Sequence, residues 1–414
     1  MATVDVVVLG AGIVGTSTAL QLARRGLAVA LIDRRNPGEA TSYGNAGIIE
    51  NKTIFPPVFP KNMRALLRVA LKRAPEANYH LSHLPQIAPW LLTFRAASHP
   101  KRLEETARVM RPLFARAVHD HEVLLADAQA SPLLRKNGWL KLYRTDEGFA
   151  GLARELELAR EFGLPFRVLD TAGAQELEPN LAPVFRHAVF WDSTASVTNP
   201  LAVTKAYAAR LREIGGVFIS AEARMLHRAG TNWRVDTAHG PLDARDAVVA
   251  LGPFTPDVLD PLGLKLPLTV KRGYHRQFRA VGNAGLARPV LDAEMGYCLA
   301  PMQDGIRLTT GVEFAPRDAA PTPVQFGRVM PAARSLFPLD QPIDTAAWMG
   351  CRPCFPDSRP VIGRAPGHAG LWLAYGHAHW GLTLGPTTGQ LLADMISGVP
   401  PFTDPVPYGA ERFR

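Results

Sequence analysis

Residues 4–15 read VDVVVLGAGIVG and residues 16–33 read TSTALQLARRGLAVALID, and these two adjoining stretches decide the fold. The first is a short apolar run, rich in valine, that leads directly into the pattern G-x-G-x-x-G. The second indicates a helix over 16–25, which Gly26 ends, and then another apolar run that closes on Asp33. Strand, glycine turn, helix, strand and acid in this order predict a βαβ unit that binds the ADP part of a dinucleotide cofactor.

The glycines and the acid have separate physical roles in such a unit. Gly10 permits the tight turn, and Gly12 lets a pyrophosphate approach the free N–H groups of the helix N-terminus because it has no Cβ. Gly15 allows the helix to pack closely on the strand. The Asp33 carboxylate accepts hydrogen bonds from ribose hydroxyls and repels a 2′-phosphate, which disfavours NADP. The fingerprint alone leaves FAD and NAD both open.

Length and composition point to a two-domain globular protein. The chain has 414 residues, of which 47% are hydrophobic and 20% charged, and it holds no apolar run long enough for a membrane span. No basic segment followed by an apolar one stands at the N-terminus, so no signal peptide is expected. Three cysteines give no disulfide framework, and Cys351 and Cys354 lack a second pair for zinc. We therefore expect a cytoplasmic protein without a metal.

The positive charge is concentrated in one segment. The formal net charge is +9, and residues 61–116 alone hold eleven lysines and arginines against three glutamates. Within that segment, residues 62–73 read NMRALLRVALKR, a basic amphipathic helix that suits an anionic membrane face. The alternative is a surface helix that packs on its own core. The segment lacks the interleaved aromatics of a nucleic-acid platform, so nucleic acid is not an expected partner.

A second glycine-rich stretch, GEATSYGNAG at residues 38–47, follows Asp33 closely. Its small residues, hydroxyls and exposed backbone donors allow the chain to lie against a phosphate or a ring. Taken alone, it reads equally well as a surface turn.

With its glycine fingerprint, the acid ending the second strand and the loop at 38–47, the chain resembles the D-amino acid oxidase-type flavoprotein superfamily. The likeness covers almost the whole chain and is strongest toward the bacterial FAD-dependent D-amino acid dehydrogenases. The resemblance implies FAD and an α/β fold, in which a Rossmann-like domain of the glutathione reductase type is joined to an α+β substrate domain on a mixed or antiparallel sheet. The expected FAD-binding domain comprises residues 1–60, 196–260 and 345–414, and the substrate domain comprises residues 61–195 and 261–344.

A second motif cluster lies near the C-terminus. Residues 350–353 read GCRP and residues 356–363 read PDSRPVIG, which is the pattern of the resembled family. Arginine is the natural clamp for an α-carboxylate because its planar guanidinium donates two parallel N–H bonds. Arg352 is therefore the candidate substrate anchor. The alternative for Arg352 is a surface salt bridge with Asp357.

The resemblance also implies further contacts. The Tyr274 hydroxyl would help to hold the substrate carboxylate, whereas the neighbouring His275 would be structural, and His379 is a candidate substrate contact. The turn at 376–381 and the start of the helix at 382–396 would face the flavin ring, where the positive end of the helix dipole favours the reduced flavin. The remaining expected cofactor contacts are backbone or small polar groups, namely Ile13, Val14, Arg34, Thr41, Ser42, Asn45, Ala46, Gly47, Gly252, Gly350, Gly376, Gly381, Leu382 and Thr383.

The activity implied is oxidative deamination of a D-amino acid to a 2-oxo acid and ammonia, with electrons passed to a quinone-type acceptor or to oxygen. A cyclic or N-substituted imino acid, such as proline, hydroxyproline or sarcosine, is an alternative substrate. A flavin-bearing subunit of a larger dehydrogenase complex is an alternative role. A quinone acceptor would place the protein at the inner face of the cell membrane.

Overall fold

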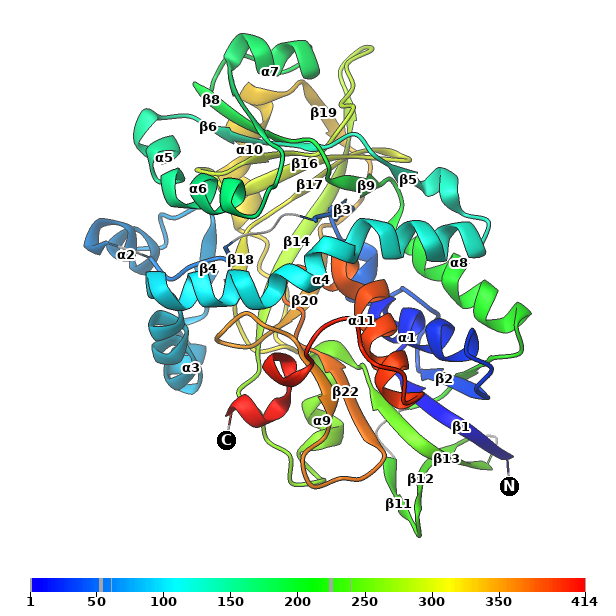
Figure 1. The fold of residues 1–414 in the computed structure, drawn as a ribbon. Coiled ribbons are helices and arrows are strands. Elements are labelled where there is room, and N and C mark those ends of the chain that lie inside the picture. Colours follow the sequence, from blue (N-terminus) through cyan, green and yellow to red (C-terminus); the bar gives the residue numbers. More distant parts are fainter. Residues whose placement is uncertain (1, 52–54, 61, 223–225, 239, 414) are drawn as a thin grey trace.

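The computed structural model describes residues 2–51, 55–60, 62–222, 226–238 and 240–413, and its strands form two large sheets (Figure 1). The first sheet has the order β10-β2-β1-β13-β12-β11, and β22 joins it by pairing with β13 and with β21. Its strands are β1 (Ala2–Leu9), β2 (Val29–Asp33), β10 (Val217–Ser220), β11 (Leu226–Ala229), β12 (Asn232–Thr237), β13 (Gly240–Val249), β21 (Val361–Arg364) and β22 (Leu371–Tyr375).

The expected βαβ unit forms the centre of this sheet. The strands β1 and β2 run parallel, and α1 (Ile13–Ala23) connects them. The residues of β1 from Val6 to Leu9 have no exposed surface, because each face of the sheet packs in a separate hydrophobic core. A continuous apolar strand is what a parallel sheet covered on both faces requires.

Helices from distant parts of the sequence pack around α1 on one face of the first sheet (Figure 1). They are α4 (Pro100–Asp127), α8 (Pro200–Glu213) and α11 (Gly381–Ile396). The contact between α1 and α11 is unusually close. A Cβ on Gly389 of α11 would lie 2.8 Å from the Ser17 carbonyl carbon and oxygen of α1. A Cβ on Gly385, in the first turns of α11, would lie 3.0 Å from Ile13 Cγ1, so the start of α11 is also fixed beside the start of α1.

The second sheet is built around the long strand β14 (Thr269–Ala280). Its order is β4-β18-β14-β17-β16-β15-β6-β8-β7, and β19 and β20 also pair with β14. The other strands are β4 (Ala77–Tyr79), β6 (Trp139–Tyr143), β7 (Arg167–Asp170), β8 (His187–Trp191), β15 (Val290–Asp292), β16 (Tyr297–Met302), β17 (Gly305–Thr309), β18 (Val312–Phe314), β19 (Leu339–Pro342) and β20 (Trp348–Cys354).

Shorter elements complete the fold. A small third sheet joins β3 (Ile48–Ile49), β9 (Ala195–Val197) and β5 (Leu134–Arg135). The remaining helices are α2 (Met63–Ala70), α3 (Leu84–Ala97), α5 (Asp146–Ala150), α6 (Ala153–Glu161), α7 (Thr171–Leu177), α9 (Pro256–Leu259) and α10 (Gln325–Leu336). Across the described ranges, none of the helices has the length and apolar character needed to cross a membrane.

One strand of the segment assigned to the FAD-binding domain pairs with the second sheet. The expectation assigned residues 345–414 to the FAD-binding domain, yet β20 pairs with β14 of the second sheet over Thr269–His275. An isolated antiparallel bridge between Cys354 and His377 then joins the end of β20 to the segment after β22 of the first sheet. The segment that carries Arg352 therefore connects the two sheets.

The close α1–α11 contact makes a stability prediction. Gly389→Ala should lower the free energy of unfolding by about 1–3 kcal/mol, because the added methyl meets backbone that has no room to move. Gly327→Ala is the matched control, since a Cβ on this helical glycine of α10 meets nothing within 4 Å. Relief of backbone entropy should make that variant more stable by roughly 0.5–1 kcal/mol. Urea unfolding followed by circular dichroism measures both. Equal effects of the two substitutions would contradict the packing argument.

Candidate active site

A single cavity of about 1900 Å³ extends from the glycine turn after β1 to β20 and the start of α11. It brings together most of the residues that the sequence singled out, although they lie more than three hundred positions apart. Those that line it are Gly10, Gly12, Ile13, Val14, Asp33, Arg34, Thr41, Ser42, Asn45, Ala46, Gly252, Tyr274, Gly350, Arg352, Gly376, His379, Gly381 and Leu382. Gly15, Gly47 and Thr383 do not line the cavity.

The glycine turn has the geometry that a pyrophosphate site needs. Gly10 has a φ of +107°, and a Cβ there would lie 2.5 Å from the Ala250 carbonyl oxygen. Gly12 caps α1 without a side-chain hydrogen bond, and a Cβ on it would meet only the Ser42 hydroxyl, at 3.4 Å. A Cβ on Gly15 would lie 1.9 Å from the Gly10 carbonyl oxygen, which explains its role in packing. The helix N-terminus is thus open toward the cavity.

Asp33 lies at the end of β2 beside this turn. Its Oδ2 accepts a hydrogen bond from the Ala11 N–H at 2.8 Å, and its Oδ1 accepts one from the Arg35 N–H at 3.0 Å. The two backbone donors fix the carboxylate at the cavity wall. The arrangement fits the ribose of an ADP group, because a carboxylate oxygen has lone pairs for further donors.

The loop at 38–47 connects the nucleotide end of the cavity to the second sheet. The Thr41 hydroxyl donates to the Cys351 carbonyl oxygen of β20 at 3.0 Å. The guanidinium of Arg307, on β17, donates to the carbonyl oxygens of Tyr43 at 2.9 Å and Asn45 at 2.7 Å. The loop is therefore held against the cavity by two strands of the second sheet and is not a free surface turn.

The opposite end of the cavity is positively charged. Arg352 lies over Gly273 of β14, and a Cβ on Gly273 would stand 2.3 Å from its Nη1. The Nη1 group donates to the Gly311 carbonyl oxygen at 3.1 Å, and in the described ranges no carboxylate forms an ion pair with Arg352. Burial lowers the pKa of Arg352, although a guanidinium stays charged at any ordinary pH.

The alternative role of Arg352, a surface salt bridge with Asp357, does not occur. Asp357 instead pairs with Arg359 and with Arg412, each at 2.9 Å. The Arg352 guanidinium is therefore left available to an anion in the cavity.

A second buried cation lies directly opposite Arg352 in the strand register. Lys271 of β14 pairs with Arg352 of β20, and its ammonium lies 4.2 Å from the ring centroid of Phe94 and 5.0 Å from that of Trp90. Burial lowers the pKa of Lys271, and the aromatic faces compensate part of the lost hydration. The Trp90 indole N–H also donates to the Cys354 carbonyl oxygen at 3.2 Å, so the aromatic cage is fixed to β20.

The turn after β22 places two histidines differently. His377 is buried and bonds the Thr388 hydroxyl through Nε2 at 2.9 Å, and burial lowers its pKa to about 3. His379 lines the cavity, and its buried Nδ1 has no hydrogen-bond partner within the described chain. Burial, followed by the nearby charges of Arg352 and Lys271, lowers the pKa of His379 well below its usual value. A neutral imidazole beside two cations is ready to bind a polar ligand.

The start of α11 is held from behind by buried groups. His121 of α4 bonds the Leu382 carbonyl oxygen through Nε2 at 2.8 Å and the Tyr207 hydroxyl through Nδ1 at 3.0 Å. Burial lowers the pKa of His121 to about 4, so it stays neutral. The Thr383 hydroxyl donates to the Ile48 carbonyl oxygen at 3.2 Å. These contacts fix the helix N-terminus at the cavity wall.

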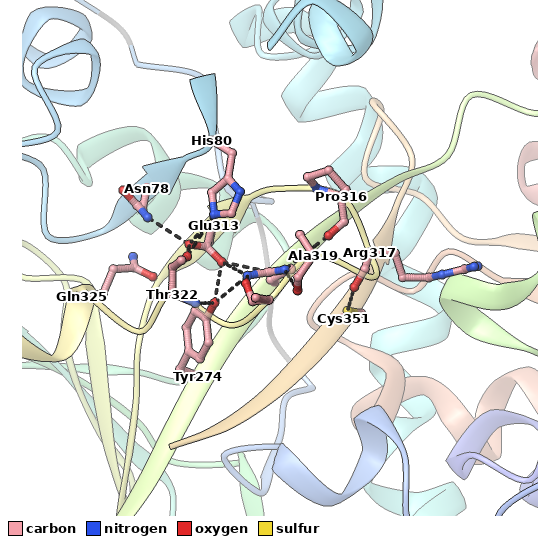
Figure 2. A network of polar contacts seen from close by, with 12 residues as sticks. Asn78, His80, Tyr274, Glu313, Pro316, Arg317, Ala319, Thr322, Gln325 and Cys351 are labelled. Atoms are coloured by element: carbon pink, nitrogen blue, oxygen red, sulfur yellow. Dashed lines mark hydrogen bonds and ion pairs between the residues drawn. The ribbon is translucent and has the colours of Figure 1, made fainter. Parts of the chain in front are cut away.

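The expected role of Tyr274 needs correction. Tyr274 borders the cavity, but its hydroxyl donates to Glu313 Oε2 at 2.5 Å and accepts from Arg272 Nη2 and the Thr322 N–H, each at 2.9 Å (Figure 2). Arg272 and Glu313 have no exposed side-chain surface. Burial, followed by the hydrogen bond to Glu313, raises the pKa of Tyr274. The hydroxyl completes a buried ion pair and is committed to it, which the alternation of β14 alone could not reveal.

His275 points to the other side of β14 from Tyr274, because successive side chains of a strand take opposite faces. Its ring stacks on Trp348 at 4.8 Å and approaches Tyr43 at 5.6 Å. The Trp348 ring in turn fills the space beside Gly44 and Gly350, where a Cβ would lie within 2.3 Å of it. The histidine therefore supports the loop at 38–47 from behind.

Several polar residues of the cavity were missed from the sequence. Glu50, Lys141, Tyr143 and Glu155 all line it, on the side of β6 and α6. A signal was present for Lys141, because a lysine interrupts the strand WLKLY at residues 139–143. Glu50 gave none, since an acid after two isoleucines reads as the end of a strand.

The βαβ unit and the continuous cavity together define a dinucleotide-binding protein. The family model described as "DAO: FAD dependent oxidoreductase" matches residues 5–395, and the chain belongs to this family. A D-amino acid dehydrogenase of Cereibacter sphaeroides is 31% identical over 99% of this chain and 95% of its own. A D-amino-acid oxidase of Bradyrhizobium diazoefficiens is 28% identical over 99% of this chain and 98% of its own. The crystal structure of glycine oxidase from Geobacillus kaustophilus has a TM-score of 0.76 at 24% identity, covering 99% of both chains.

The nucleotide end of the cavity makes a binding prediction. Asp33→Asn should raise the FAD dissociation constant about 10-fold or more, because hydrogen bonds to a charged group contribute about 1.5–3 kcal/mol each. Fluorescence titration of the apoprotein with FAD measures the constant. Glu213→Gln, at the exposed end of α8, is the control and should leave it unchanged. Unaltered FAD affinity in Asp33→Asn would remove Asp33 from the cofactor site.

Proposed function

We propose that this chain catalyses the FAD-dependent oxidative deamination of a D-amino acid to a 2-oxo acid and ammonia. The observation that carries the proposal is Arg352, a half-buried guanidinium that lines the cavity without a paired carboxylate in the described ranges. An uncompensated buried cation is costly, and an α-carboxylate that binds it in a bidentate manner offsets that cost. The relatives named for D-amino acids support the choice of enantiomer.

The residues around Arg352 would orient a substrate that binds to it. Lys271 adds a second positive charge behind Arg352, and the backbone carbonyl of Gly311 holds one side of the guanidinium. His379, whose pKa burial and the two nearby cations lower, lines the same end of the cavity and would border the substrate amine. The carboxylate and amine would thus be fixed at the end of the cavity formed by β20 and the turn at 376–381.

FAD supplies the two-electron acceptor for the Cα–H bond when it is bound. The residues that would hold it are the glycine turn and Asp33 at the nucleotide end, and the loop at 38–47 and the start of α11 at the ring end. The N-terminus of α11 would place a partial positive charge near the ring, which favours the reduced form. Positioning of the substrate can itself contribute roughly 7–11 kcal/mol to the rate, so no strong base is required.

The anchor is tested by removing it in two ways. Arg352→Lys should weaken substrate affinity about 10- to 100-fold, because an ammonium lacks the bidentate geometry. Gly273→Ala should have a similar effect without touching Arg352, because the new methyl occupies the position of its guanidinium. The measurement is the concentration dependence of flavin bleaching after anaerobic mixing with D-amino acids, L-amino acids and imino acids.

The control for this experiment is Arg359→Lys, which lies off the cavity and pairs with Asp357. All three variants should retain FAD and melt close to the wild type, so that a loss of affinity reports on the anchor. Wild-type affinity in both Arg352→Lys and Gly273→Ala would contradict the proposed site. Faster bleaching by an imino acid than by any D-amino acid would replace the substrate class.

We further propose that the electrons pass to a quinone-type acceptor at an anionic membrane surface. Met63, Leu67 and Leu71 form a stripe along α2 and just beyond it, and their side chains are 52–68% exposed. Arg64, Arg68 and Lys72 follow beside them in the sequence, although Arg68 also pairs with Glu76; Lys61 lies outside the described residues. An exposed apolar stripe beside cations suits the interface of an acidic bilayer. Met63 also borders the cavity, together with Leu92 of α3.

Vesicle binding tests this surface. Combined substitution of Met63, Leu67 and Leu71 by serine should abolish cosedimentation with vesicles of phosphatidylglycerol and phosphatidylcholine, because it removes the apolar contact. The same wild-type binding should weaken with salt, since it also depends on charge. Val406→Ser, an exposed apolar residue far along the chain, is the control. Wild-type protein that stays in the supernatant at low salt would refute membrane contact.

A further inference from the structure

A group of charged side chains lies on the wall of the cavity formed by β6 and α6, apart from the cations at Arg352 and Lys271. Trp139, Lys141 and Tyr143 alternate along β6 and so share one face, which borders the cavity. The Lys141 ammonium lies 3.5 Å from Glu155 Oε2 of α6. Glu50 follows β3 and lies near enough to both for their charges to act on it.

Glu50 is fixed in place through its backbone and not through its carboxylate. Its N–H donates to the Thr383 hydroxyl at 3.4 Å, which ties it to the first turn of α11. The side chain lines the cavity, and the hydrogen bonds found in the described ranges include none to its carboxylate. Glu50 is half-buried at the cavity wall, and a carboxylate with limited access to water and no donors is costly to keep ionised.

The charges on this wall do not cancel. Glu50 and Glu155 face a single Lys141, so the three groups sum to −1 when both acids are ionised. Burial by itself lowers the pKa of Lys141, but Glu155 and its other neighbours raise it above the usual value, so the ammonium stays charged. Tyr143, whose pKa burial raises, and the Cys298 thiol, whose pKa burial raises to about 12, stay neutral. A cation in the cavity would balance the remaining negative charge of these three groups.

We propose that Glu50, with Lys141 and Glu155, selects substrates whose side chain ends in a cation, so that the preferred amino acid carries a terminal ammonium or guanidinium. The α-carboxylate binds at Arg352, and the distal cation takes the donor-free side of the Glu50 carboxylate. This assignment rests on the proposed oxidation of an amino acid and adds the class of its side chain. Both ends of such a substrate meet opposite charge within one cavity.

The pH dependence of the preference follows from Glu50. Burial, opposed in part by Lys141 and reinforced by Glu155, raises the pKa of Glu50 to about 7. Below that pH the carboxyl is neutral and the charges of Lys141 and Glu155 cancel, so a distal cation gains little. Above it the wall carries −1 and attracts the cation. Selectivity for a cationic side chain should therefore rise between pH 6 and pH 8.

The experiment compares D-lysine with D-norleucine, which has a side chain without the terminal charge. The holoenzyme is mixed anaerobically with each, and the ratio of the second-order rate constants for flavin reduction is measured from pH 6 to pH 8. In the wild type this ratio should favour D-lysine and increase about 10-fold over the range. In Glu50→Gln the ratio should fall about 10-fold at pH 8 and lose its pH dependence.

A matched control and the contrary outcomes complete the test. Glu157→Gln removes a carboxylate from the exposed side of the same helix as Glu155 and should leave the ratio unchanged. An identical ratio in wild type and Glu50→Gln, with both amino acids still reducing the flavin, would overturn the role of Glu50 and leave the proposed reaction intact. If neither amino acid nor any other reduces the flavin, the proposed function fails first, and the assignment of Glu50 falls with it.

Discussion

The connection between the two sheets at the end of β20 determines how Arg352 and His379 lie relative to each other. The Cys354–His377 bridge and the hydrogen bond from the Ala378 N–H to the Pro353 carbonyl oxygen, at 2.9 Å, join β20 to the turn after β22. Arg352 belongs to the second sheet by its pairing, whereas His379 follows a strand of the first. Because this junction holds both backbones together, Arg352 and His379 line the same cavity.

One end of the cavity is positively charged, because two cations there have no carboxylate partner in the described ranges. Most charged groups elsewhere in the described chain have partners, as Arg272 has Glu313, which form an ion pair with no exposed side-chain surface. The cations of Arg352 and Lys271 have only carbonyl oxygen and aromatic faces. Such unmatched charges would be destabilising if they served only the fold, since a buried ion without a counter-ion costs several kcal/mol. Their presence in one cavity is an argument for a charged ligand.

The sequence predicted the nucleotide half of this protein better than the substrate half. Gly10, Gly12 and Asp33 lie within thirty residues of each other, so local geometry brings them together, and all three line the cavity. For Tyr274, the local sequence does not indicate which groups the hydroxyl contacts. Neighbouring residues of a strand take opposite faces, but the hydroxyl's partners come from Glu313 and Thr322, and only the tertiary structure places them there.

The same limit explains why Glu50 and Lys141 were missed. Lys141 lies on a strand of the second sheet and Glu50 beside the small third sheet, and nothing in the local pattern of either indicates that they share a wall. The pairing of β20 with the second sheet was not evident from the sequence for a related reason. The motif GCRP indicates chemistry shared with the flavin site, whereas the hydrogen-bond pairing of the strand depends on β14, more than seventy residues earlier.

The position of α2 and α3 at the rim of the cavity has a consequence for the traffic of small molecules. Met63 and Leu92 belong both to the exposed apolar surface and to the cavity lining. If that surface rests in lipid, the opening faces the acyl chains, and a hydrophobic oxidant can arrive by two-dimensional diffusion without crossing water. A zwitterionic amino acid would have to come from the aqueous side, so the two reactants would reach one chamber by separate routes.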